Sequence, residues 1–188
     1  YLHVQFDVQN NATFFYYSFC FSLRSFYCFN MDEKKALFKY SALCSKSEHC
    51  EYDIREKMHR TDLTPEQQQR IISFLRKEKY IDDVRYAAVF VRDKLQFNGW
   101  GEQKIRFELH RRQIDNEAIS KAFDEVDNAL FSQKLLKAMQ AKMRSAHDAD
   151  PYKLRAQLMR FGASKGFSFE QISAVVDEVM KTIDIDND

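Results

Sequence analysis

The sequence predicts an all-α protein built from tandem helical repeats. Only 4 glycines and 2 prolines occur in 188 residues, too few for the many turns of a β-sandwich or barrel. Apolar residues recur at helical spacing through nearly all of the chain after Met31. One short pattern, in which Arg stands between two apolar residues four positions apart, occurs three times at nearly constant intervals. These observations predict three tandem three-helix units that form an elongated, curved array.

The first thirty residues differ from the rest of the chain. They contain eleven Phe or Tyr residues, and only Asp7 and Arg24 carry a charge. The sequence becomes charged and helix-like at Met31, so we expect translation to begin there and residues 1–30 to be an over-extended, disordered start. The alternative is a signal peptide or a membrane anchor. The missing basic start and the interruption at Arg24 disfavour it, and we expect no membrane association.

The first unit is predicted at residues 31–80. Its helices lie near 33–45, around Tyr52 to Met58, and in the stretch that follows Thr64. Thr64 is placed to cap that third helix, because Pro65 occupies the first helical position and a glutamine stands at the third.

The second unit is predicted at residues 81–128, with helices near 82–97, around Gln103 to Leu109 and near 115–127. The first of these carries one apolar stripe, formed by Val84, Ala87, Ala88, Val91 and Leu95. Asp82 and Asp83 precede the stripe, where acids cap a helix and stabilise its first turn. Gly99 is expected to end the helix in the left-handed conformation, and Gly101 to let the chain restart.

The third unit is predicted at residues 129–181, followed by an acidic tail at 182–188. Its helices lie near 129–145, around Tyr152 to Leu158 and around Ser168 to Met180. The recurring pattern begins at Tyr52, Gln103 and Tyr152 in the three units, so the copies are 51 and 49 residues apart. A single unit of this size buries too little surface to be stable, and stacking of copies supplies the missing core.

No catalytic residue, cofactor site or metal site is predicted. Cys44, His49, Cys50 and His59 are spaced too widely for a usual zinc site, which predicts a buried Cys44 and solvent-facing histidines. The adjacent Asp82 and Asp83 are typical of a helix cap and not of a carboxylate pair for acid–base chemistry. The sequence contains no phosphate-binding glycine loop and no nucleophile motif.

Basic residues are distributed unevenly, although the net charge is only +1. Residues 129–169 contain eight Lys or Arg and two Asp, which gives this segment a charge of +6. Rows of Lys and Arg indicate a polyanionic partner, and ordinary solvated helix faces are the alternative. The candidate binding residues are Lys104, Arg106, Arg111, Arg112, Lys134, Lys137, Lys142, Arg144, Lys153, Arg155, Arg160 and Lys165. Trp100 is expected to be a wedge between units, and Tyr86 and Phe90 to pack on a neighbouring unit.

The stretch from Tyr80 to Asp115 resembles the central signature of the RecX family, bacterial regulators of the RecA recombinase. The residues that carry the resemblance are Ile81-Asp82-Asp83, Arg85-Tyr86-Ala87, Gly99-Trp100-Gly101, Ile105-Arg106 and Glu108-Leu109. A weaker resemblance extends from about Met31 to about Met180. The first unit departs from the family pattern at "CEYDIREKM", and the third unit is a loose match.

The resemblance implies a cytoplasmic, non-enzymatic regulator that functions in DNA repair, recombination and the SOS response. Family members bind the RecA filament on single-stranded DNA and restrain its ATPase, strand-exchange and co-protease activities. A monomer without cofactors is expected. The alternatives are a stand-alone helical nucleic-acid-binding module and a structural helical adaptor.

Overall fold

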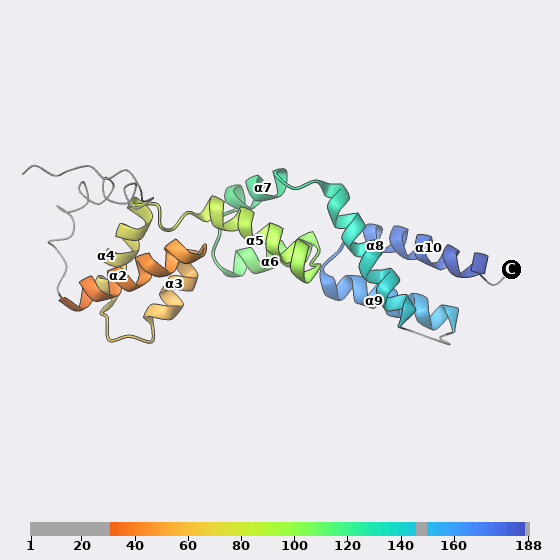
Figure 1. The fold of residues 1–188 in the computed structure, drawn as a ribbon, viewed down its shortest axis with the longest axis horizontal. Coiled ribbons are helices and arrows are strands. Elements are labelled where there is room, and N and C mark those ends of the chain that lie inside the picture. Colours follow the sequence, from red (N-terminus) through yellow and green to blue (C-terminus); the bar gives the residue numbers. More distant parts are fainter. Residues whose placement is uncertain (1–30, 146–149, 187–188) are drawn as a thin grey trace, which may run out of the picture.

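The computed structural model describes residues 31–145 and 150–186, which form nine α-helices and no strand (Figure 1). The prediction for residues 1–30 lies outside the described part of the chain. The helices are α2 (Met31–Lys46), α3 (Glu51–Met58), α4 (Pro65–Lys77), α5 (Asp83–Asn98), α6 (Glu102–Arg111), α7 (Asn116–Asp124), α8 (Asn128–Arg144), α9 (Pro151–Lys165) and α10 (Phe169–Asp186).

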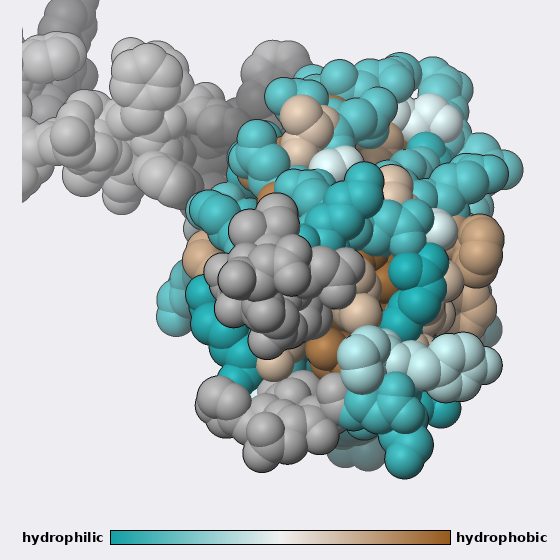
Figure 2. Space-filling model, turned by 90° about the vertical axis from the view of Figure 1, so that its right-hand side faces the viewer, coloured by the Kyte–Doolittle hydropathy of each residue, from teal (hydrophilic) through white to brown (hydrophobic). Residues whose placement is uncertain are grey.

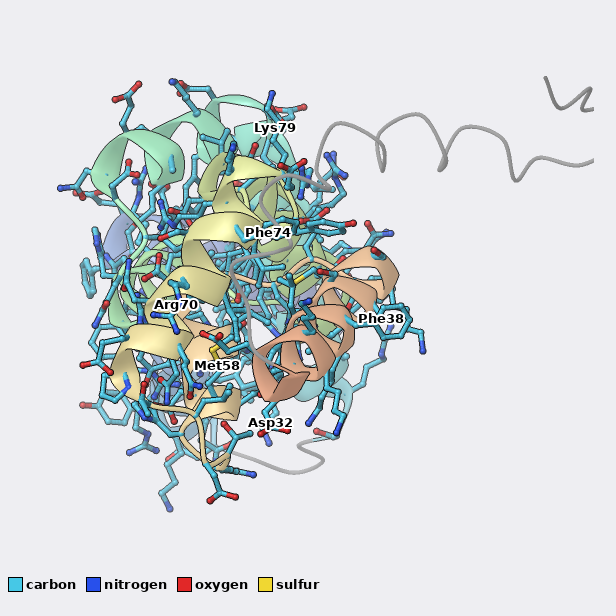
Figure 3. The ribbon with its side chains drawn as sticks, turned by 90° about the vertical axis from the view of Figure 1, so that its left-hand side faces the viewer. Asp32, Phe38, Met58, Arg70, Phe74 and Lys79 are labelled. Carbon is cyan, nitrogen blue, oxygen red and sulfur yellow. The ribbon has the colours of Figure 1, made fainter. Side chains whose placement is uncertain are left out.

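The helices fall into three successive groups of three, which lie in a row along the long axis of the molecule (Figure 1). We call α2–α4 the first repeat, α5–α7 the second repeat and α8–α10 the third repeat. The chain therefore has the all-α, elongated architecture that its periodicity predicts. Figure 3 views the row from the first-repeat end, where Phe38 points away from the other helices and Met58 lies between α2 and α4.

The second helix of each repeat begins in the same way. Cys50, Gly101 and Asp150 are its N-caps in the three repeats, and each stands four residues before a buried apolar residue. In each case the carbonyl of the cap accepts a hydrogen bond from the backbone N–H of that residue, at 3.2, 3.2 and 2.9 Å. The recurring sequence pattern thus marks structurally equivalent positions.

The buried residues form two separate cores. One core belongs to the first repeat and includes Tyr40, Ile54 and Ile72. The other core is continuous through the second and third repeats, and it includes Ile105 and Leu158. The second and third repeats therefore form one packed body, and the first repeat has a core of its own.

The predicted caps are present. Thr64 accepts a hydrogen bond from the backbone of Gln67, whose side chain accepts one from the backbone of Thr64. The Asp82 carboxylate accepts a bond of 3.0 Å from the backbone N–H of Arg85, and Gly99 ends α5 with φ +58°.

One sequence expectation about α5 needs correction. Val84 is exposed and not part of the core, because the buried side of α5 is turned toward Tyr86 and Phe90 instead. The helix α10 continues to Asp186, since no glycine or proline interrupts it, so residues 182–186 of the predicted acidic tail are helical.

Candidate nucleic-acid and partner interface

The twelve predicted basic residues separate into three groups according to what their charged groups contact. Four arginines form ion pairs with carboxylates, three lysines donate hydrogen bonds to backbone carbonyls, and five residues contact neither. A cation that is already paired within the fold is less available to a polyanion than one without such a contact.

The four paired residues are Arg106, Arg111, Arg112 and Arg155. Arg111 and Arg112 both contact Glu108, at 3.0 and 2.7 Å. Arg112 is the least exposed of the four, and its nitrogen Nε also lies 3.7 Å from the Asp53 carboxylate of the first repeat. These positions make Arg112 part of the contact between two repeats.

The arginine of the recurring pattern has a structural role in every repeat. Arg55 and Arg106 each bind the glutamate at the start of their own helix, Glu51 and Glu102, at 2.7 Å. In the third repeat Pro151 stands where the glutamate would be, and Arg155 pairs with Asp177 of α10 instead, at 2.7 Å. The recurrence of this arginine in all three copies was the sequence signal for its ion pairs within the fold. A count of charges alone does not reveal these pairs.

The three lysines that contact carbonyls lie at the boundary between the second and third repeats. Lys104 donates to the carbonyl of Ser164, Lys134 to that of Gln96 and Lys165 to that of Asn98, all at 3.1–3.2 Å. The acceptors belong to the last turns of α5 and α9, where carbonyls lack helical partners and the helix dipole favours cations. These lysines stabilise helix ends across the repeat boundary.

Trp100 lies at the same boundary, half-buried against the core that the second and third repeats share. The ammonium groups of Lys94 and Lys104 lie 5.3 and 4.8 Å from the centre of its ring. Next to it, the N–H of Gly101 donates to the carbonyl of Lys165 at 2.8 Å. The Gly-Trp-Gly turn is therefore a contact between repeats, and two lysines already occupy positions over the ring.

The five basic residues without such contacts all belong to the third repeat, and all are exposed. In the described part of the chain, no carboxylate or carbonyl lies within bonding distance of their charged groups. They are Lys137, Lys142, Arg144, Lys153 and Arg160. Where described residues are visible at the third-repeat end of the molecule, the surface is mostly hydrophilic, with small apolar areas between (Figure 2).

Lys153 and Arg160 share one side of α9. They are seven positions apart, so their directions differ by only about 20° around the helix axis. Leu154 and Leu158 face the core from the other side of the same helix. The two cations therefore project together into solvent from a rigid, buried support.

Beyond the predicted set, Arg92 of α5 is also exposed and makes no ion pair with a described residue. Sequence reasoning missed it because the count of basic residues was centred on residues 129–169.

Asp82 is used as a cap, and Asp83 binds Arg76 of the first repeat at 3.0 Å. Burial raises the pKa of the Asp83 carboxyl, against the opposing effect of Arg76.

In the ranges described, no three His, Cys, Asp or Glu side chains gather closely enough to hold a metal ion. Cys44 is buried as predicted and His59 is exposed, but His49 is half-buried and burial lowers its pKa. None of the described helices has both the length and the apolar character needed to cross a membrane.

Family profiles match two of the repeats. The profile for "RecX, second three-helix domain" matches residues 82–122, and that for "RecX, third three-helix domain" matches residues 132–176. The chain is also 32% identical to "Regulatory protein RecX" of Vibrio vulnificus (strain CMCP6) over 137 residues, which are 72% of this chain and 88% of the relative.

A relative from Clostridium botulinum (strain Alaska E43 / Type E3), with the same name, is 30% identical over 132 residues, 69% of this chain. The matched part is 61% of that relative's length. The fold resembles a crystal structure of RecX from Lactobacillus salivarius, with a TM-score of 0.66 and 21% identity over 79% of this chain and 96% of that one. A second crystal structure, of "regulatory protein RecX", gives a TM-score of 0.70 at 23% identity over 77% of this chain and 73% of that one.

Proposed function

The chain belongs to the RecX family of regulatory proteins, and we propose that it binds the RecA filament on single-stranded DNA and restrains the activities of the filament. The proposed effects are inhibition of the DNA-dependent ATPase, of strand exchange and of co-protease activity. In this proposal the protein acts without chemistry of its own, as a monomer in the cytoplasm.

The observation that carries the proposal, beside family membership, is the group of five cations on the third repeat that contact no carboxylate or carbonyl among the described residues. A polyanion such as DNA in a filament releases counterions when cations like these approach its phosphates, and that release favours binding. The three boundary lysines and the paired arginines contribute less, because forming a new contact would cost each of them an existing one. We therefore place the main DNA-facing surface on α8 and α9.

The test replaces Lys153 and Arg160 together by glutamine. Both side chains are exposed, so the fold should keep its stability to within about ±0.5 kcal/mol. Inhibition of RecA's single-stranded-DNA-dependent ATPase should weaken. The log–log salt dependence of filament binding should flatten by about one to two units, because up to two phosphate contacts are lost.

A matched control removes the same charge from residues that are already paired, as Arg111→Gln/Arg155→Gln. This variant should inhibit nearly as well as the unmodified protein. An equal loss of inhibition in both variants would mean that only the net charge of the protein matters. Full inhibition by the Lys153→Gln/Arg160→Gln variant would show that this side of α9 is not part of the interface.

A pull-down distinguishes the rival functions. With RecA present, retention on RecA–single-stranded DNA filaments that greatly exceeds retention on bare DNA supports a filament regulator. Equal and tight binding to bare DNA would favour a stand-alone nucleic-acid-binding module. Binding neither to the filaments nor to bare DNA would favour a structural helical adaptor.

A further inference from the structure

The contact between the first and second repeats combines charged and polar side chains with a small apolar contact, in which Cys50 and Tyr52 of the first repeat pack against the core of the second. Three ion pairs cross it, Arg85 with Glu48 at 2.7 Å, Arg76 with Asp83 at 3.0 Å and Arg112 with Asp53 at 3.7 Å. Apart from Cys50 and Tyr52, the buried apolar residues of the described first repeat pack in a core of their own. We call this contact the polar seam.

Asp53 lies at the centre of the polar seam. Its carboxylate accepts a hydrogen bond of 3.1 Å from the hydroxyl of Tyr86, and it lies 3.7 Å from the guanidinium of Arg112. Tyr86 and Arg112 belong to the second repeat, so this one carboxylate of the first repeat binds two partners across the boundary. Burial, together with the nearby Cys50 and Asp53, raises the pKa of Tyr86, which keeps its hydroxyl protonated as a donor.

The hydrogen bonding of the polar seam is incomplete. Nε of Arg112 and one carboxylate oxygen of Glu48 are buried without a hydrogen-bond partner in the described structure. Buried groups of this kind weaken the arrangement that contains them, and entry of water relieves the cost. The closed seam is therefore less favourable than its short ion pairs suggest.

The chain crosses the polar seam in a short linker between α4 and α5. Lys79 in this linker has φ +57°, a conformation that non-glycine residues rarely adopt. Arg85 donates to the carbonyls of Lys79 and Tyr80, at 3.0 and 3.5 Å, so a side chain of the seam also holds the linker in place. Loss of the seam contacts would release the hold of Arg85 on the linker, while the N–H groups of Tyr80 and Ile81 stay bonded to the carbonyl of Leu75 in the first repeat.

We propose that the polar seam is a hinge, which opens while both cores stay folded and lets the first repeat swing about the junction between Ile81, which belongs to the first core, and Asp82, which caps α5. Domains that share a polar interface move relative to one another unless a large apolar interface prevents it. Mobile ions screen the charges of a solvent-accessible seam, so rising salt favours the open form. The hinge goes beyond the proposed regulation of RecA, and its test needs only the isolated chain.

Two cysteines provide the reporter. Cys50 lies in the polar seam, 0% exposed and packed in the core of the second repeat, whereas Cys44 is 8% exposed in the core of the first repeat. Burial raises the pKa of both thiols to about 11, so each reacts slowly with an alkylating agent until it is uncovered. If the exposure in the closed structure sets the rates, Cys44 reacts faster than Cys50. If the hinge opens, Cys50 reacts faster than Cys44.

The experiment alkylates the full chain with iodoacetamide and measures each cysteine separately by peptide mass spectrometry. If the hinge opens, Cys50 is modified about tenfold faster than Cys44 or more. Raising NaCl from about 50 mM to about 500 mM should accelerate Cys50 much more than Cys44, because opening of the seam uncovers Cys50, whereas Cys44 stays in the first core and only senses the charges of Glu48 and Arg85.

The variant Asp53→Asn weakens both contacts of that carboxylate and should accelerate Cys50 further. The matched control Glu117→Gln removes one carboxylate from an exposed ion pair within the second repeat, with Lys121, and should change neither rate. Equal rates at both cysteines, without a response to salt, would show that Cys50 is uncovered only by global unfolding and would overturn the hinge. If Asp53→Asn does not fold, the salt response of the unmodified chain decides the question.

Discussion

Asp82 determines where α5 begins. Its side chain satisfies a backbone N–H that would otherwise lack a partner at the start of the helix. The neighbouring Asp83 has another task, since it reaches the first repeat through Arg76. Two adjacent aspartates thus act on two different repeats.

Replacing Asp82 by alanine should lower the free energy of unfolding by about 1 kcal/mol, the usual cost of a lost helix cap. Asp82→Ser keeps an acceptor at the same place and should recover most of that loss. Urea denaturation followed by circular dichroism measures both. If serine is as destabilising as alanine, the carboxylate stabilises α5 through its charge and not through the cap bond.

At this scale the sequence predicted local features well and long-range partners poorly. The caps at Thr64 and Asp82 and the turn at Gly99 follow from residue types that few other conformations favour. The pairing of Arg112 with Asp53, 59 positions away, has no local signal, and neither does the burial of Cys50. For the same reason the sequence could not distinguish unpaired from paired basic residues.

Among the helices, α5 and α9 meet through their glycine turns. A Cβ on Gly101 would overlap the backbone carbonyl of Gly166, whereas a Cβ on Gly99 would meet open space. The two glycines of the Gly-Trp-Gly turn are therefore needed for different reasons. Gly99 supplies the left-handed conformation, and Gly101 supplies the close approach between repeats.

Gly101→Ala should consequently cost more than Gly99→Ala. The first substitution forces two backbone segments apart, at about 2–3 kcal/mol, and the second imposes left-handed strain of about 1 kcal/mol. Urea unfolding of the two variants provides the comparison. Equal costs would contradict the direct backbone contact between the second and third repeats.

At the level of the whole molecule, the two cores divide the chain unequally. Helical periodicity predicted three units, and residues 31–145 and 150–186 form three groups of helices but two hydrophobic cores. Periodicity identifies the buried side of a helix and not the element that covers it, so the shared core was not predictable. The second and third repeats depend on each other.

A fragment that begins at Asp82 should therefore fold on its own and unfold cooperatively, with some loss of stability because Tyr86 and Phe90 lose their cover. A fragment of residues 82–128 should not fold, because it keeps only part of the shared core. Circular dichroism with urea titration tests both. Cooperative unfolding of the shorter fragment would mean that the second repeat is an independent domain.

The equivalent N-caps of the second helices differ in what can dock against them. Cys50 and Gly101 each touch the repeat that follows, and both are small and uncharged. Asp150 holds the same position in the last repeat, where it is exposed and carries a negative charge. A further copy that docked there would have to desolvate that carboxylate, which disfavours head-to-tail polymerisation of whole chains. The charge at the third of these equivalent positions thus disfavours docking of another repeat on that surface.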